Sequence, residues 1–152
     1  WDEGEPKKAF EKAIANSNKV AMSLSDLFCV ERHKLQFLEL VKNKLDIVFA
    51  NEQEILSLID GKSFEDVISF SKHFKKDIII TRGEKGAVAI NFNEVFECQA
   101  KKGLNIKDLT GAGDLFAAGY LHGYINELSK KECLEKGTEL SSKVIQKIGA
   151  RL

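Results

Sequence analysis

Three short runs of apolar residues place the strongest limit on the fold of this chain. They span residues 20–24, 47–50 and 78–81, and each is too short for a helix of ordinary length. Amphipathic stretches separate them, and nearly continuous apolar runs are typical of strands that helices cover on both faces. The pattern predicts an α/β fold with a mostly parallel sheet.

Two further strands are predicted at residues 86–90 and 95–100, on either side of Asn91-Phe92-Asn93-Glu94. Asparagine tolerates turn conformations, so these runs predict a β-hairpin at one edge of the sheet. Ser129 and Glu132 form a capping-box pattern for the last of the predicted helices. Those helices span residues 5–17, 31–42, 52–59, 64–73, 113–126 and 130–148. Without an internal repeat or a proline-rich linker, one domain is the simplest organisation.

Charge and cysteine usage exclude several classes of protein. Lys plus Arg and Asp plus Glu both count 23, so no surplus of positive charge favours binding to a nucleic acid. The three cysteines lack the spacing of a disulfide framework or a zinc site, which favours a reducing cytoplasm. No apolar run approaches the roughly 20 residues that a bilayer requires, so we expect no membrane partner. Because the chain opens on Trp1 rather than on Met, we expect that it starts inside a longer protein.

The segment Asp108-Leu109-Thr110-Gly111-Ala112-Gly113-Asp114 puts small residues where a loop enters a predicted helix. The first amides of a helix lack partners and the helix dipole adds about half a positive charge, so an anion such as a phosphate is favoured there. Asp114 lies within reach of such a group and could accept a proton from an attacking hydroxyl. A tight turn followed by a favourable first-turn acid explains these residues equally well. Gly119 and Gly123, inside the helix, predict close packing against the sheet.

Two commoner phosphate motifs are excluded. A dinucleotide fingerprint that begins at Gly111 would need a small residue where Phe116 stands. The string Gly61-Lys62-Ser63 would need a glycine where Leu56 stands to be a Walker A loop, so it is interpreted as a turn.

The segment 108–114 resembles the C-terminal signature of the PfkB, or ribokinase, family of carbohydrate and nucleoside kinases. Residues 51–54 (Asn-Glu-Gln-Glu) follow a predicted strand and are similar to the family's Asn-x-x-Glu motif. By themselves they are explained as a helix N-cap and its third-position acid. Residues 81–86 (Thr-Arg-Gly-Glu-Lys-Gly) are similar to the family's Thr-x-Gly-x-x-Gly segment, although a polar turn before a hairpin explains them too.

The resemblance implies a role for particular residues. Asp114 would be the catalytic base, and the amides of Gly111, Ala112 and Gly113 would stabilise the transferring phosphoryl group. Glu54 would position Mg²⁺, through water. The implied contacts to ATP are Asn51, Thr81, Arg82, Gly83, Thr110 and Ser142, with Ser141 and Val144 as further candidates for the wall around adenine. Leu109 departs from the residue often found in the signature, which leaves the backbone amides unaffected.

The resemblance covers nearly the whole chain. It implies that residues 1–152 form the C-terminal ATP-binding and catalytic part of a ribokinase-like domain, without the N-terminal part and the lid. Residues 23–33 and 148–151 look like the adenosine kinase branch, which implies transfer of the γ-phosphoryl of ATP to a hydroxymethyl group of adenosine. Two alternatives stay open: a sugar kinase for ribose, fructose or a keto-deoxy sugar acid, and a nucleotide-binding fragment without catalysis.

Overall fold

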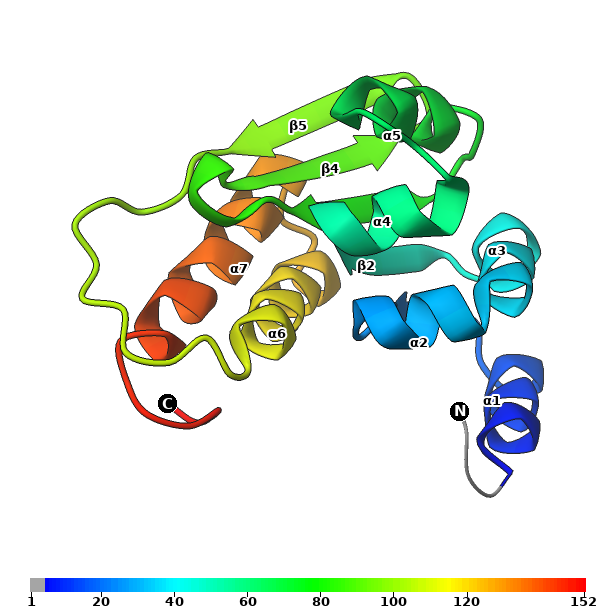
Figure 1. Cartoon of the computed structure of the whole chain (residues 1–152), viewed down its shortest axis with the longest axis horizontal. Coiled ribbons are helices and arrows are strands. Elements are labelled where there is room, and N and C mark those ends of the chain that lie inside the picture. Colours follow the sequence, from blue (N-terminus) through cyan, green and yellow to red (C-terminus); the bar gives the residue numbers. More distant parts are fainter. Residues whose placement is uncertain (1–4) are drawn as a thin grey trace.

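A single mixed sheet forms the centre of the computed structural model, which describes residues 5–152 (Figure 1). Trp1, on which the expectation of a longer parent protein rests, is one of residues 1–4, which the structure does not describe. The strand order is β1-β2-β3-β4-β5, with parallel pairing from β1 to β3 and antiparallel pairing from β3 to β5. The strands are β1 (Ala21–Ser23), β2 (Ile47–Asn51), β3 (Asp77–Thr81), β4 (Ala87–Asn91) and β5 (Glu94–Cys98). The predicted α/β architecture is therefore confirmed, including the hairpin at one edge.

The hairpin turn is shorter than predicted. Asn91 pairs with Glu94, so Phe92 and Asn93 alone make the turn, and Phe92 adopts a φ of 52°. At the other end of β4, Gly86 stays outside the strand with a φ of 92°. A Cβ atom on Gly86 would lie 2.0 Å from the carbonyl oxygen of Cys98, so only glycine fits this close approach.

Most helices begin and end near their predicted limits. They are α1 (Pro6–Ala15), α2 (Leu27–Arg32), α3 (Lys34–Asn43), α4 (Glu52–Ile59), α5 (Phe64–Ser71), α6 (Ala112–Ile125) and α7 (Lys130–Val144). The single helix predicted over residues 31–42 is wrong, because α2 begins earlier, after the N-cap Asp26, and a break at His33 separates it from α3. The predicted capping box of α7 is present, with the Ser129 hydroxyl accepting from the Glu132 amide.

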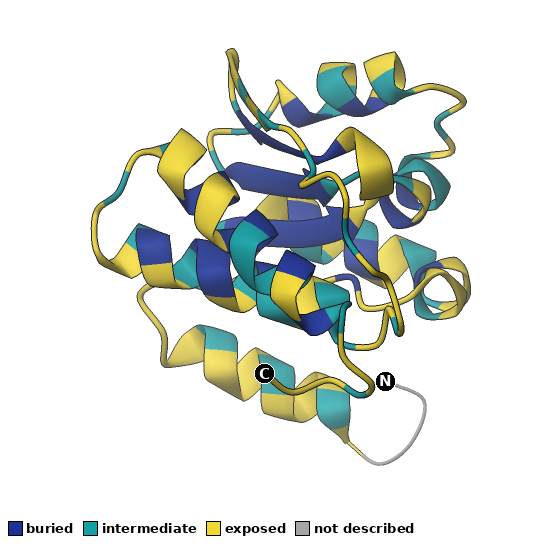
Figure 2. Cartoon of the chain, turned by 90° about the vertical axis from the view of Figure 1, so that its left-hand side faces the viewer, coloured by how far each residue is buried: buried dark blue, intermediate teal, exposed yellow. Residues whose placement is uncertain are grey.

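The two faces of the sheet carry separate apolar cores, because side chains alternate along each strand. One face packs against α2 to α5, and its strand residues are Val48, Ala50, Ile78, Ile80, Val88 and Ile90. The other face packs against α6 and α7, and its strand residues are Ile47, Phe49, Ile79, Ala87 and Ala89. Figure 2 shows these buried strands between two helical layers whose outer surfaces are exposed.

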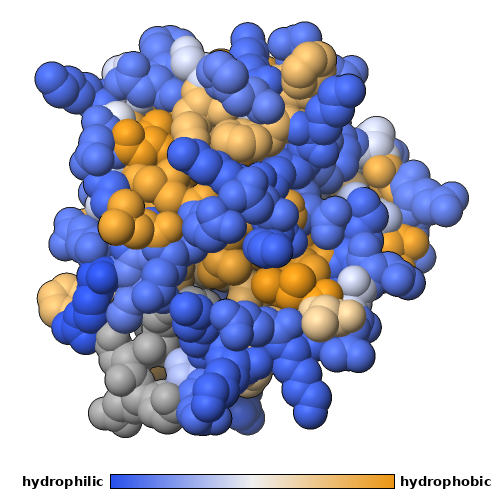
Figure 3. All heavy atoms as spheres, turned by 90° about the vertical axis from the view of Figure 1, so that its right-hand side faces the viewer, coloured by the Kyte–Doolittle hydropathy of each residue, from blue (hydrophilic) through white to orange (hydrophobic). Residues whose placement is uncertain are grey.

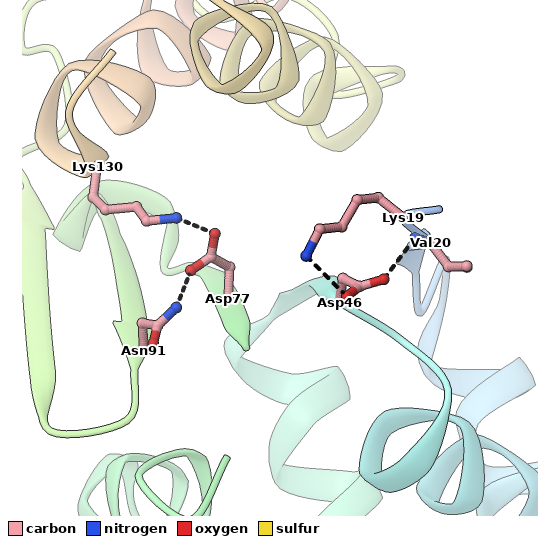
Figure 4. Close-up of polar contacts among 6 residues, drawn as sticks. All are labelled: Lys19, Val20, Asp46, Asp77, Asn91 and Lys130. Atoms are coloured by element: carbon pink, nitrogen blue, oxygen red, sulfur yellow. Dashed lines mark hydrogen bonds and ion pairs between the residues drawn. The ribbon is translucent and has the colours of Figure 1, made fainter. Parts of the chain in front are cut away.

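The amino ends of β2 and β3 are fixed by acidic side chains (Figure 4). Asp77 is buried and accepts hydrogen bonds from the Asn91 amide, at 2.6 Å, and from the ammonium group of Lys130. Asp46 accepts from the backbone amide of Val20 at 2.9 Å and from Lys19 at 3.3 Å. The hydrogen bonds of Asp77 join the beginning of α7 to the sheet. They lie at the amino ends of the strands, whereas the predicted site residues lie at the carboxyl ends.

The face that carries α1, α3 and α5 mixes apolar patches with polar side chains (Figure 3). Phe10 and Ile14 of α1 and Leu40 of α3 line a groove of about 570 Å³ there. Among the described residues, no helix is long and apolar enough to span a bilayer.

Candidate functional site

Two adjoining pockets lie at the carboxyl ends of β2 and β3. The larger has a volume of about 440 Å³ and reaches from β1 and β2 to the N-terminus of α6. The smaller, of about 350 Å³, reaches from the beginning of β4 to the end of α7. Residues that line both are Thr81, Gly83, Leu109, Ala112, Gly113 and Phe116. The predicted phosphate loop therefore lies where the two pockets meet.

The N-terminus of α6 is open toward the larger pocket. Its N-cap residue, Gly111, has a φ of 77° and offers no capping side chain. The Ala112 amide donates to the Leu109 carbonyl at 3.1 Å, whereas no described residue accepts from the amides of Gly113 and Asp114. These two unpaired donors point to an anion site at the helix end. The sequence motif predicted the amides of Gly111, Ala112 and Gly113 for this role, and for Asp114 it predicted a role of the side chain only.

Asp114 is the third residue of α6 and lines the larger pocket. Its side chain is exposed, and within residues 5–152 its carboxylate makes no hydrogen bond or ion pair. The carboxylate is therefore free to accept a proton from a group that enters this pocket.

Asp108 shapes the loop that precedes α6. Its carboxylate accepts from the Thr110 hydroxyl at 2.7 Å, from the Thr110 amide at 2.9 Å and from the Gly149 amide at 2.8 Å. These bonds, above all that from the Thr110 hydroxyl, hold the pKa of Asp108 below its usual 3.8. Thr110 was predicted to contact ATP, but its hydroxyl is used within the loop and it lines neither pocket.

A strap without helix or strand, residues 99–111, covers one side of the smaller pocket (Figure 1). The amides of Lys107 and Asp108 donate to the Ile145 carbonyl at 2.8 and 3.3 Å, and the Asn105 amide donates to the Gln146 side chain at 3.4 Å. The large apolar strap residues in the pocket wall are Leu104, Ile106 and Leu109. Sequence reasoning missed the first two, although apolar residues at spacings of two and three within a polar loop were a usable signal.

Asn51 and Glu54 serve at once as a helix cap and as part of the larger pocket. The Glu54 carboxylate accepts from the Asn51 backbone amide at 2.9 Å and from its side-chain amide at 2.7 Å. Burial raises the pKa of Glu54 above its usual 4.5, and the Asn51 backbone bond opposes this rise. The described residues hold no cluster of three possible metal ligands.

Three residues in the segment after β3 were predicted to contact ATP, and the structure places two of them, but not the third, in the pocket walls. Thr81 and Gly83 line both pockets, as predicted for residues beside phosphates. Arg82 lines neither. It pairs with Glu52, and its guanidinium carbon lies 3.5 Å from the centre of the Phe64 ring.

The last helix supplies the far wall of the smaller pocket. Ser141 and Ser142 line it, as predicted, together with Thr138 and Ile145, which were not predicted. The Ser142 hydroxyl donates to the Thr138 carbonyl at 2.6 Å, so it is held within the helix. Val144 is fully buried and is not part of the wall. Ser23, Ser25 and Phe49 also line the larger pocket and were not predicted as site residues, although Ser23 and Ser25 belong to the segment 23–33 that resembles the adenosine kinase branch.

Comparisons with known proteins place the chain in a family. The model of the pfkB family of carbohydrate kinases matches residues 6–152. Cytidine kinase from Thermococcus kodakarensis is 35% identical over 112 residues, 72% of this chain and 40% of that protein. Adenosine kinase 2 from Arabidopsis thaliana is 31% identical over 157 residues, 91% of this chain and 44% of that protein. The crystal structure of adenosine kinase from Sinorhizobium meliloti matches all of this chain and 48% of its own, with 38% identity and a TM-score of 0.95. The chain thus spans about half the length of the relatives it matches.

Proposed function

The chain belongs to the pfkB family of carbohydrate kinases, and on this premise we propose that it is the catalytic part of an ATP-dependent nucleoside kinase. The observation that carries the proposal is the meeting of two pockets at the N-terminus of α6, with Asp114 in the larger one. The smaller pocket has the apolar walls that suit a nucleotide base, and the larger has a more polar lining, which includes the side chains of Asn51, Glu54 and Asp114 and suits phosphates and an acceptor.

In the proposed reaction, the Asp114 carboxylate accepts the proton of a hydroxymethyl group as the hydroxymethyl oxygen attacks the γ-phosphorus of ATP, and the bond from that phosphorus to the β,γ-bridging oxygen breaks so that ADP leaves. The open amides of Gly113 and Asp114 stabilise the charge on the transferring phosphoryl group, and the N-cap Gly111 has no side chain to occupy the helix end; the Ala112 amide, used by the Leu109 carbonyl, is left out of this role. Asn51, Thr81 and Gly83 orient the phosphates. Glu54 would hold Mg²⁺ through water, and the ion would supply positive charge against the phosphate oxygens.

Adenosine is the proposed acceptor, and residues 1–152 are proposed to be the C-terminal part of the enzyme. The similarity to adenosine kinases over 91% and 100% of this chain supports both proposals, since each match uses about half of the relative. The N-terminal part would then complete the acceptor site beside the larger pocket.

A second candidate is a nucleotide-binding module without catalysis. The exposed side chain of Asp114 favours such a module. Phosphoryl transfer to a hydroxyl requires that water be kept from the reacting groups, and no described residue shields this carboxylate from water. Both candidates predict nucleotide binding, but only the kinase predicts turnover.

The test is to incubate the complete protein with ATP, Mg²⁺ and one acceptor at a time: adenosine, cytidine, ribose or fructose. Product formation is followed by mass spectrometry and the ratio kcat/KM is compared. The proposal expects phosphorylation of the nucleoside hydroxymethyl group, with adenosine the best acceptor. ATP binding without any product would support the module, and a higher kcat/KM for a sugar would identify a sugar kinase.

A further inference from the structure

The salt bridge between Glu52 and Arg82 joins the two segments that follow β2 and β3. Asn51 and Thr81 are register partners at the last paired position of these strands, and both line the larger pocket. Glu52 and Arg82 are the next residue in each segment, so the bridge is formed one residue beyond the pocket wall.

The contact has a well-defined geometry. The Arg82 Nε atom donates to Glu52 Oε2 at 2.9 Å, and Nη2 donates to Oε1 at 3.4 Å. The two side chains are only 18% and 23% exposed, and the guanidinium also stacks on Phe64, the first residue of α5. A planar fork that bonds a carboxylate while it stacks on a ring is a geometry that lysine cannot reproduce.

Arg82 is poorly placed to bind a phosphate. Its Nε and Nη2 atoms are used by Glu52, one face of its guanidinium is covered by Phe64, and the side chain lines neither pocket. The Arg82 hydrogen bond also holds the pKa of Glu52 below its usual 4.5, so the partner carboxylate is ionised at neutral pH.

We infer that Arg82 is a positioning residue, which acts on the nucleotide phosphates through Glu52 rather than by contact. The bridge fixes the N-terminus of α4, which carries Asn51 and Glu54, against the loop that carries Thr81 and Gly83. The backbone of the same loop is closed by the Arg82 amide, which donates to the Gly86 carbonyl at 2.8 Å. This inference rests on the proposed function, in which these four residues surround the phosphates and Mg²⁺.

The inference implies that the effects of substituting Glu52 and Arg82 on nucleotide binding are coupled, although neither residue lines a pocket. Loss of either partner releases the same restraint, so both losses shift the phosphate-facing groups in the same way. Small displacements of positioning groups cost about 10- to 100-fold in affinity or rate. A residue that bound phosphate directly would show no dependence on Glu52.

The test is a double-mutant cycle in the complete protein with Glu52→Gln, Arg82→Gln and the double variant. The measurements are KM for MgATP and for the acceptor, and the Kd for MgADP by calorimetry. Each single variant is expected to raise KM and Kd for the nucleotide roughly tenfold, with the acceptor KM unchanged. The double variant is expected to be no worse than either single variant, and Arg82→Lys to restore only part of the affinity.

The matched control is Lys85→Gln. Lys85 lies 3.8 Å from Glu52 but is 67% exposed and lines neither pocket, so its loss is expected to leave both nucleotide constants unchanged. An unaltered nucleotide affinity in Glu52→Gln, or additive effects in the double variant, would overturn the inference and make Arg82 a direct ligand or a purely structural residue. If the complete protein phosphorylates no acceptor, the proposed kinase function fails, while the cycle measured on MgADP affinity still decides the role of Arg82.

Discussion

Gly119 of α6 faces Gly137 of α7 so closely that a Cβ atom on Gly119 would lie 2.8 Å from the Cα atom of Gly137. The same Cβ would lie 2.5 Å from the Lys136 carbonyl oxygen, so the two helices pack backbone against backbone. The prediction that Gly119 and Gly123 pack against the sheet is therefore wrong, because Gly123 also faces α7, at Cys133. This contact holds the helix whose N-terminus lines the larger pocket.

Gly119→Ala is expected to lower the free energy of unfolding by about 2 kcal/mol, since its Cβ would overlap backbone that cannot rotate away. The melting temperature should fall by roughly 4 to 8 °C, measured by circular dichroism. Gly113→Ala is the control for stability, because no atom lies within 4 Å of its Cβ position in the same helix. Equal melting temperatures in the two variants would contradict the close approach.

Asp114→Asn is expected to lower kcat of the complete enzyme by roughly 100-fold or more, because general base catalysis contributes about that factor. The affinity for ATP should change little, since the backbone amides of α6 remain. Steady-state kinetics and calorimetry measure the two quantities, with Glu97→Gln on the exposed surface of β5 as control. Turnover close to that of the unaltered enzyme would remove Asp114 from the mechanism.

Glu54→Gln is expected to shift the dependence of kcat on Mg²⁺ to higher concentration, because an amide positions the ion and its waters less well than a carboxylate. The glutamine side chain still accepts from the Asn51 backbone amide, so the cap of α4 is largely kept. The measurement is a Mg²⁺ titration at saturating ATP. An unchanged titration curve would leave Glu54 with a capping role alone.

Lys130→Met is expected to destabilise the fold by about 2 to 3 kcal/mol, because it leaves the buried Asp77 carboxylate with the Asn91 amide alone as its side-chain donor. The value lies below that for a fully buried pair, since the Lys130 side chain is 27% exposed. Urea unfolding provides the measurement, and Lys131→Met, on the exposed surface, is the control. Adding Asp77→Asn to Lys130→Met should recover part of the lost free energy of unfolding, because the unpaired charge is removed. A further loss of stability would mean that the unpaired charge of Asp77 is not the cause of the destabilisation.

Asp46→Asn is expected to destabilise the protein at pH 7 and to do so less as the pH falls. The Val20 amide, more than any other group, holds the pKa of Asp46 below its usual 3.8. A depressed pKa contributes stability that is present above pH 3.8 and is lost as the pH falls through the folded value. We expect a difference of about 1 kcal/mol or less at pH 7, because solvent screens this partly exposed carboxylate.

Urea unfolding of the two proteins at pH 7, 5 and 3 measures this difference, with Glu135→Gln on the exposed surface of α7 as control. A difference that grows toward low pH would show that the hydrogen bond to Val20 does not favour the ionised carboxylate.

The inner strands β2 and β3 were predictable from sequence because they are buried on both faces, whereas β1 and β5 at the edges contain no buried residue. Residues 47–50 and 78–80 carry apolar side chains for both cores, and no helical period fits such short runs. The break between α2 and α3 was not predictable in the same way. Apolar residues continue across His33 with helical spacing, and only the N-cap at Asp26 marks the true start.

Within the site, most residues in local motifs were predictable, Thr110 and Arg82 excepted, whereas most residues brought in by tertiary contacts were not. Asp114, Asn51, Glu54, Thr81 and Gly83 each stand at the end of a strand or the start of a helix, and all line the larger pocket. Thr138 and Ile145 reach the smaller pocket only because α7 packs against α6. The partner of Arg82 was equally hidden, since Glu52 is 30 residues away in the chain.

Three backbone amides in the middle of the strap, residues 99–111, donate hydrogen bonds to the two residues that follow α7, Ile145 and Gln146. Segments with few such bonds open readily, and a ligand that packs against them suppresses the opening. Amide hydrogen exchange at Asn105, Lys107 and Asp108 should therefore slow when the smaller pocket is filled. These three amides would then report nucleotide occupancy without any need for turnover.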